Sequence, residues 1–125
     1  MYKLILLIAV MAASTVFNTA IADEWQCKGF GYAYSFKTKS FYFSPMQRYI
    51  VDTNSIPRKT AFYNDWNAYF KGEIRKANQY TVKVVQDCEN TGFPTGVGKT
   101  LSKLKAKYNQ KNFNGYRLQH YYYQR

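Results

Sequence analysis

Bulky and small residues alternate near the start of the chain. Between Trp25 and Phe36, aromatic side chains occupy one face of a predicted strand and small side chains occupy the other. The aromatic positions are Phe30, Tyr32, Tyr34 and Phe36, and the small positions are Gly29, Gly31, Ala33 and Ser35. After polar residues 37–40, the segment 41–43 resumes the pattern as a short second strand, which Ser44 and Pro45 interrupt.

A helical pattern follows a turn cluster at residues 52–55. We expect this helix to run from about Pro57 to Ala77, because large apolar residues recur there at spacings of three and four. They are Phe62, Trp66, Tyr69, Phe70, Ile74 and Ala77. Residues 80–88 are rich in β-branched side chains and predict a strand. One face of it carries Tyr80, Val82, Val84, Gln86 and Cys88.

The last third of the chain predicts a loop, a helix and a strand. Residues 90–98 are rich in glycine, proline and threonine, and the helix that follows places four apolar side chains in one sector. These are Val97, Leu101, Leu104 and Tyr108. A turn at Asn112 and Asn114 leads to a closing strand at 116–123, in which Tyr121, Tyr122 and Tyr123 cannot all face the core.

The element order is therefore β-β-α-β-α-β, which predicts an α+β fold. Amphipathic helices and strands in this order are accommodated by a two-layer sandwich, with both helices packed on one face of a three- to four-stranded sheet. The order is similar to that of the small SPOR-type envelope domains, which bind peptidoglycan. This resemblance covers topology only, and no residue motif carries it.

The first 22 residues have the pattern of a secretory signal peptide. Lys3 precedes an apolar run at 4–13, and the small residues Ala20 and Ala22 suit a cleavage site after Ala22. The run is about half the ~20 residues that a membrane span requires. We expect a cleaved leader at 1–22, one small α+β domain at 23–125, no transmembrane segment in the mature form, and a periplasmic or secreted location.

Export changes the interpretation of the two cysteines. In an oxidising compartment Cys27 and Cys88 are expected to pair, and there is no Cys-x-x-Cys motif to favour a redox role. Two cysteines and a single histidine also exclude a multi-cysteine zinc site. The sequence predicts a structural disulfide, no metal centre and no cofactor.

Charge is distributed unevenly. The chain has a formal net charge of +11. Residues 23–89 hold ten basic and seven acidic side chains, whereas residues 90–125 hold seven basic and none that are acidic. Lysines at spacings of four follow one flank of the second helix, where an anionic partner would relieve their mutual repulsion. The candidate anion-binding residues are Lys99, Lys103, Lys107, Lys111 and Arg117. A solvated face that keeps the protein soluble explains the same lysines.

Aromatic residues are a second excess, since Phe, Trp and Tyr make up 19% of the chain. More rings are present than two helix stripes can use, so some are expected at the surface, where they suit sugar rings, stacked bases or protein partners. Others fill the core in place of leucine. The rings assigned to the core are Phe30, Phe36, Phe62, Trp66 and Phe70.

Two enzymatic readings compete with a binding role. The segment 92–100 ends in Gly-Lys-Thr, but the spacing of a phosphate-binding loop puts Phe93 where glycine is required, so we expect no nucleotide. His120 on a late strand resembles the histidine of small basic secreted ribonucleases, which pair it with a glutamate and arginines. That mechanism would bring Glu73 or Glu89 and Arg117 to His120.

The favoured hypothesis is a small exported, non-catalytic binding module. Its basic C-terminal third would engage an anionic polymer, such as an acidic glycan or lipopolysaccharide, or an acidic protein surface. The alternatives are an inhibitor or immunity-type protein that blocks an exported enzyme, and the ribonuclease. The oligomeric state does not follow from the sequence.

Overall fold

The computed structural model describes residues 24–51 and 56–123 of the chain. The predicted signal peptide at 1–22 and the predicted turn at 52–55 lie outside the described residues. Within them the elements are β1 (Trp25–Ser35), β2 (Ser40–Phe43), β3 (Gln47–Val51), α2 (Ile56–Glu73), the 3-10 turn η1 (Ala77–Gln79), β4 (Thr81–Glu89), α3 (Gly96–Gln110) and β5 (Asn114–Arg117). The predicted α+β class is confirmed.

Strand β1 is the centre of a five-stranded mixed sheet in the described part of the chain. It pairs antiparallel with β4 along one side, from Gln26↔Glu89 to Tyr34↔Thr81. On the other side it pairs antiparallel with β3 in its first half and with β2 in its second half. Strand β5 then adds parallel to β2. Strands β3, β5 and β4 therefore form the borders of the sheet.

The small residues of β1 receive helix α2. Phe62, Trp66 and Phe70 of this helix are fully buried. A Cβ atom added to Gly31 would lie 2.2 Å from Cδ2 of Trp66, and one added to Gly29 would lie 3.0 Å from Cε2 of Phe62. The indole Nε1 of Trp66 donates a hydrogen bond to the carbonyl of Tyr32 at 3.2 Å. The glycines thus supply the space into which the rings of α2 insert.

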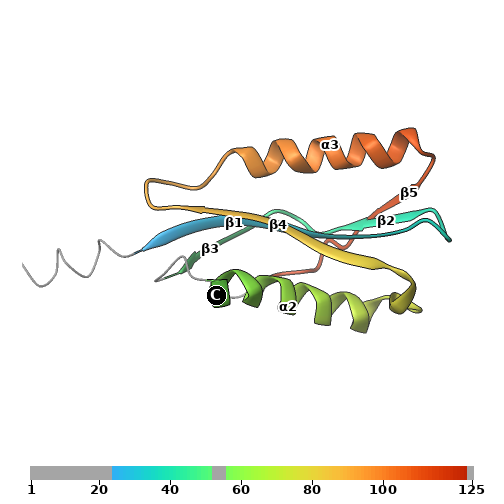
Figure 1. The fold of residues 1–125 in the computed structure, drawn as a ribbon, viewed down its shortest axis with the longest axis horizontal. Coiled ribbons are helices and arrows are strands. Elements are labelled where there is room, and N and C mark those ends of the chain that lie inside the picture. Colours follow the sequence, from blue (N-terminus) through green and yellow to red (C-terminus); the bar gives the residue numbers. More distant parts are fainter. Residues whose placement is uncertain (1–23, 52–55, 124–125) are drawn as a thin grey trace, which may run out of the picture.

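The aromatic residues of β1 receive helix α3 on the opposite face. Tyr108 of α3 stacks on Phe41 of β2, with ring centroids 4.6 Å apart, and on Tyr34 of β1, at 5.4 Å. Because successive residues of a strand point to opposite faces, Tyr34 and Gly31 cannot face the same helix. Figure 1 shows the result, with α3 on one side of the sheet and α2 on the other.

This layer arrangement corrects two details of the predicted fold. The helices lie on opposite faces and not on one, because each face of β1 has its own complementary helix. The sheet has five strands and not three to four, because residues 47–51 form β3, which was not predicted. Burial alternates along this strand. Its inward-facing residues are Gln47, Tyr49 and Val51, and its exposed residues are Arg48 and Ile50.

The closing strand is shorter than predicted. Strand β5 ends at Arg117, and the chain then crosses to the α2 face without regular structure. The side chain of Gln47 holds it there by donating to the carbonyl of Tyr121 at 3.2 Å and accepting from the N–H of Tyr123 at 2.9 Å. Tyr121 and Tyr123 are buried and Tyr122 is 72% exposed, which confirms that the three rings do not share one side.

The predicted disulfide is confirmed. Cys27 of β1 and Cys88 of β4 are direct cross-strand partners, and their sulfur atoms are bonded. Both belong to the buried cluster between the sheet and α2. A bond of this kind is typical of proteins that fold in an oxidising compartment. Among the helices of the described residues, none is long and apolar enough to cross a membrane.

Candidate anion-binding surface

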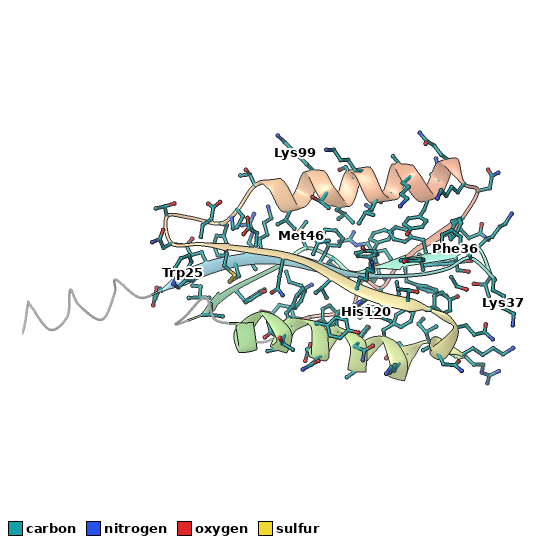
Figure 2. All side chains as sticks on the ribbon, viewed as in Figure 1. Trp25, Phe36, Lys37, Met46, Lys99 and His120 are labelled. Carbon is teal, nitrogen blue, oxygen red and sulfur yellow. A yellow bond between two sulfur atoms is a disulfide. The ribbon has the colours of Figure 1, made fainter. Side chains whose placement is uncertain are left out.

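Helix α3 presents its lysines to solvent because its apolar side is fixed on the sheet. Val97 and Tyr108 are buried, and Leu101 and Leu104 are half-buried. All of the predicted anion-binding residues are exposed, namely Lys99, Lys103, Lys107, Lys111 and Arg117. Figure 2 shows Lys99 pointing away from the sheet. The helix therefore forms an outer layer with a polar, cationic exterior.

The C-terminal end of α3 is fixed by a Schellman motif. Asn112 takes a left-handed conformation with φ of 60°, which asparagine tolerates better than most residues. The N–H of Phe113 donates to the carbonyl of Tyr108 at 3.0 Å, and the N–H of Asn112 donates to that of Asn109 at 3.1 Å. The ring of Phe113 packs on Tyr108 at 5.0 Å. This motif holds Lys111, the C-cap residue, at a defined place and directs the chain into β5.

The predicted residues divide between the two flanks of α3. Lys99, Lys103 and Lys107 follow one flank, and the ammonium of Lys111 lies 5.6 Å from the ring centre of Phe36. Arg117 is on the other side, because it is the β5 partner of Phe43 and so lies on the α3 face beside β2. Four-residue spacing along α3 and its C-cap thus puts the four lysines on one side of the helix axis, whereas Arg117 belongs to β5.

Lys105 was not predicted as part of the surface. Its ammonium lies 4.4 Å from the ring centre of Phe43, the cross-strand neighbour of Arg117. The 100° helical rotation puts Lys105 on the flank opposite Lys107, and this signal was present in the sequence. We define the α3 basic surface as Lys99, Lys103, Lys105, Lys107, Lys111 and Arg117.

Aromatic rings lie next to both flanks of this surface. Phe36 is 61% exposed and does not belong to the core, because it falls in the turn after β1. Its assignment to the core is therefore corrected, whereas Phe30, Phe62, Trp66 and Phe70 are fully buried as predicted. Phe36 on one flank and Phe43 on the other each receive a lysine ammonium by a cation–π contact. Exposed cations and apolar rings are thus available side by side.

The tyrosines beneath α3 remain neutral at ordinary pH. Burial, together with the nearby Tyr34 and Tyr32, raises the pKa of Tyr108 to about 12. Burial and Tyr34 also raise the pKa of Tyr32. Ionised phenols therefore do not offset the lysines above them, and residues 90–123 contain no aspartate or glutamate. The α3 basic surface keeps its positive charge without a compensating carboxylate from its own segment.

His120 lines a hollow whose other lining residues are not those predicted to accompany it. It is exposed and lines a hollow of ≈ 470 Å³ at the border of β3. The lining consists of Pro45, Met46, Gln47, Arg48, Gln119, His120, Tyr121 and Tyr122. Arg48 is present in place of Arg117, and neither Glu73 nor Glu89 belongs to the lining. The glutamate, arginine and histidine of a ribonuclease-like site are not assembled in this hollow.

The glycine-rich segment before α3 forms a loop and the start of the helix. Helix α3 begins at Gly96, and Pro94 in the preceding loop is fully buried. Within residues 24–51 and 56–123, no cluster of three His, Cys, Asp or Glu side chains could hold a metal ion.

Comparisons of this chain with protein-family models, curated proteins and solved structures find no match. The similarity to SPOR-type domains was based on the predicted order β-β-α-β-α-β; these comparisons do not support it, and the observed order contains the additional strand β3.

Proposed function

We propose that the protein is an exported, non-catalytic module that binds an anionic glycan polymer through the α3 basic surface. The observation that carries the proposal is the exposure of six cationic side chains on α3, its C-cap and the adjoining strand β5, in a segment without a carboxylate. Such a surface attracts polyanions over a distance of about 10 Å at 0.1 M salt. The disulfide and the predicted leader support a periplasmic or secreted location.

The cationic and the aromatic groups of this surface have complementary roles in the proposal. The ammonium groups supply attraction to carboxylate, sulfate or phosphate groups, and the exposed ring of Phe36 supplies an apolar contact for a sugar face. The cation–π contacts at Phe36 and Phe43 hold two lysines close to the rings before a ligand arrives. Ordered side chains lose less conformational entropy when they bind.

Charge-reversal variants test the proposal on an immobilised sulfated polysaccharide and on lipopolysaccharide. The triple variant Lys99→Glu, Lys103→Glu, Lys107→Glu is expected to elute at much lower salt than the unaltered protein. The matched control Lys71→Glu, Arg75→Glu, Lys76→Glu changes the net charge equally but alters exposed residues at the end of α2 and beyond it. Both variants are expected to keep their stability within about 0.5 kcal/mol, because the sites are exposed.

The control separates a defined surface from net charge. Early elution of the α3 variant alone supports the proposal. Equal losses in both variants would show that any cationic surface of this protein suffices, and absence of retention on both polymers would contradict a glycan partner.

A further inference from the structure

One edge of the sheet is a long, regular strand. Among the described strands β4 pairs with β1 alone, so its other edge borders no strand within residues 24–51 and 56–123. β4 is nine residues long and carries the β-branched residues Thr81, Val82, Val84 and Val85. An extended edge of this kind is a template for pairing with another strand.

The disulfide reveals which backbone groups face that edge. The Cα atoms of Cys27 and Cys88 are 4.1 Å apart, the short spacing of a non-hydrogen-bonded antiparallel pair. The N–H and C=O groups of Cys88 therefore point away from β1, and by alternation so do those of Val82 and Val84. The N–H of Cys88 donates to its neighbour, Oδ1 of Asp87, at 2.9 Å.

The charged residues of β4 are placed so that two antiparallel copies of this strand bring opposite charges together. Lys83 and Asp87 are exposed and point to the α3 face, since they pair with Tyr32 and Lys28 of β1. They lie two residues before and two residues after Val85. In an antiparallel pair of two β4 strands centred on Val85, Lys83 of each copy is directly opposite Asp87 of the other.

We propose that β4 is the interface for a second copy of this chain, joined edge to edge about a two-fold axis at Val85. In this register Lys83 and Asp87 form a non-hydrogen-bonded pair, in which side chains approach most closely. Glu89 of the second copy is the diagonal neighbour of Lys83. Asp87 then lies between Lys28 of its own β1 and Lys83 of the second copy. The N–H of Cys88 would donate to the carbonyl of Val82 of the second copy in place of Oδ1 of Asp87.

The open edge of β4 has room beside α2 for side chains of the second copy. A hollow of ≈ 420 Å³ lies between α2 and β4. Its lining is Thr60, Tyr63, Val82, Lys83, Val84 and Gln86. In the proposed register Val84 is opposite Gln86 of the second copy, so each copy adds side chains beside this hollow. Pairing would join two five-stranded sheets into one.

Sedimentation velocity over a concentration series tests the interface on the oxidised, processed protein. We expect a reversible dimer that the single variants Lys83→Asp and Asp87→Lys each weaken by about tenfold or more, because like charges then face each other twice. The double variant Lys83→Asp, Asp87→Lys restores opposite charges and is expected to restore the dimer. Lys71→Asp, which alters an exposed lysine of α2, is the matched control and leaves the dimer unchanged.

A second variant tests the backbone pairing without changing a charge. Val84→Pro removes an N–H that points to the open edge and spares the hydrogen bonds to β1, so it is expected to give a folded monomer. A monomer at all concentrations of the unaltered protein would overturn the proposal. So would a dimer that the single charge reversals do not weaken, or one that the double variant does not restore.

Discussion

The two helices cover opposite faces of one sheet, and they meet it in different ways. Helix α2 inserts three fully buried rings, Phe62, Trp66 and Phe70, against the glycines of β1. Helix α3 buries only Val97 and Tyr108 and rests on rings that belong mainly to the sheet. The α2 layer also contains the disulfide and the hydrogen bond from Tyr121 to Asp65, at 2.7 Å.

The difference separates stability from surface chemistry. Burial of a large apolar side chain contributes about 1.5–3 kcal/mol, so the three rings of α2 make its face the main source of stability. The exterior of α3 is free to carry lysines because few of its residues are needed for packing. Changes on the α2 face should therefore affect unfolding, and changes on the exterior of α3 should affect binding.

Removal of the disulfide is expected to have the largest effect on stability. The bond joins residues 61 positions apart, and the chain-entropy model assigns such a closed loop about 4 kcal/mol. The double variant Cys27→Ala, Cys88→Ala should lose about this amount in denaturant unfolding. A loss below about 1 kcal/mol would show that the α2 layer is stable without its covalent link.

The next largest loss of stability is expected for Gly31→Ala. This variant should lose about 3 kcal/mol of unfolding free energy, because the new methyl group would overlap the buried ring of Trp66. Gly115→Ala is the matched control on β5, where an added Cβ would have nothing within 4 Å. Urea unfolding of both variants measures the difference. Equal stabilities would contradict the close approach of α2 to β1.

Ionisation of the buried tyrosines on both faces is expected to lower the stability of the fold at alkaline pH but not at neutral pH. Burial raises the pKa values of Tyr49 and Tyr121 in the α2 layer, and it raises the pKa of Tyr108 under α3 to about 12. The native state therefore holds these protons more tightly than the unfolded state does. The resulting stability is complete below pH 10 and is lost as pH rises through 10 toward the native pKa values.

Tyr108→Phe should raise the pH midpoint of alkaline unfolding, because one of these protons no longer contributes. Tyr122→Phe, at a position that is 72% exposed, serves as the control and should leave the midpoint unchanged. Circular dichroism followed against pH, alongside the phenolate absorbance, measures both. An unchanged midpoint for Tyr108→Phe would contradict its burial beneath α3.

The same contrast explains what could be predicted from the sequence. Alternation in β1 and the apolar spacing in both helices identified most elements, and compartment reasoning paired Cys27 with Cys88. The size of the side chains on each face of β1 was not enough to predict which face each helix covers. The glycine face of β1 resembles an exposed surface until Trp66 is placed against it, and that contact joins residues far apart in the sequence.

The candidate surface was predictable in part for a related reason. Helical spacing identified the flank of Lys99, Lys103 and Lys107, which depends only on local geometry. The grouping of Lys105 with Arg117 depends on the pairing of β5 with β2 around Phe43, which the spacing of residues along the chain does not encode. Strand β3 was missed because its polarity does not follow its burial: the inward-facing Gln47 is polar and the exposed Ile50 is apolar.

The most direct measurement for the central claim is a titration of the ¹⁵N-labelled, oxidised protein with a short sulfated oligosaccharide, followed by NMR. Amide shift changes are predicted at Lys99, Lys103, Lys105, Lys107, Lys111 and Arg117, and in the adjacent turn at Phe36, with little change along α2. Changes centred on α2 or on the hollow at His120, or no changes at any concentration, would contradict the assignment of anion binding to the α3 layer.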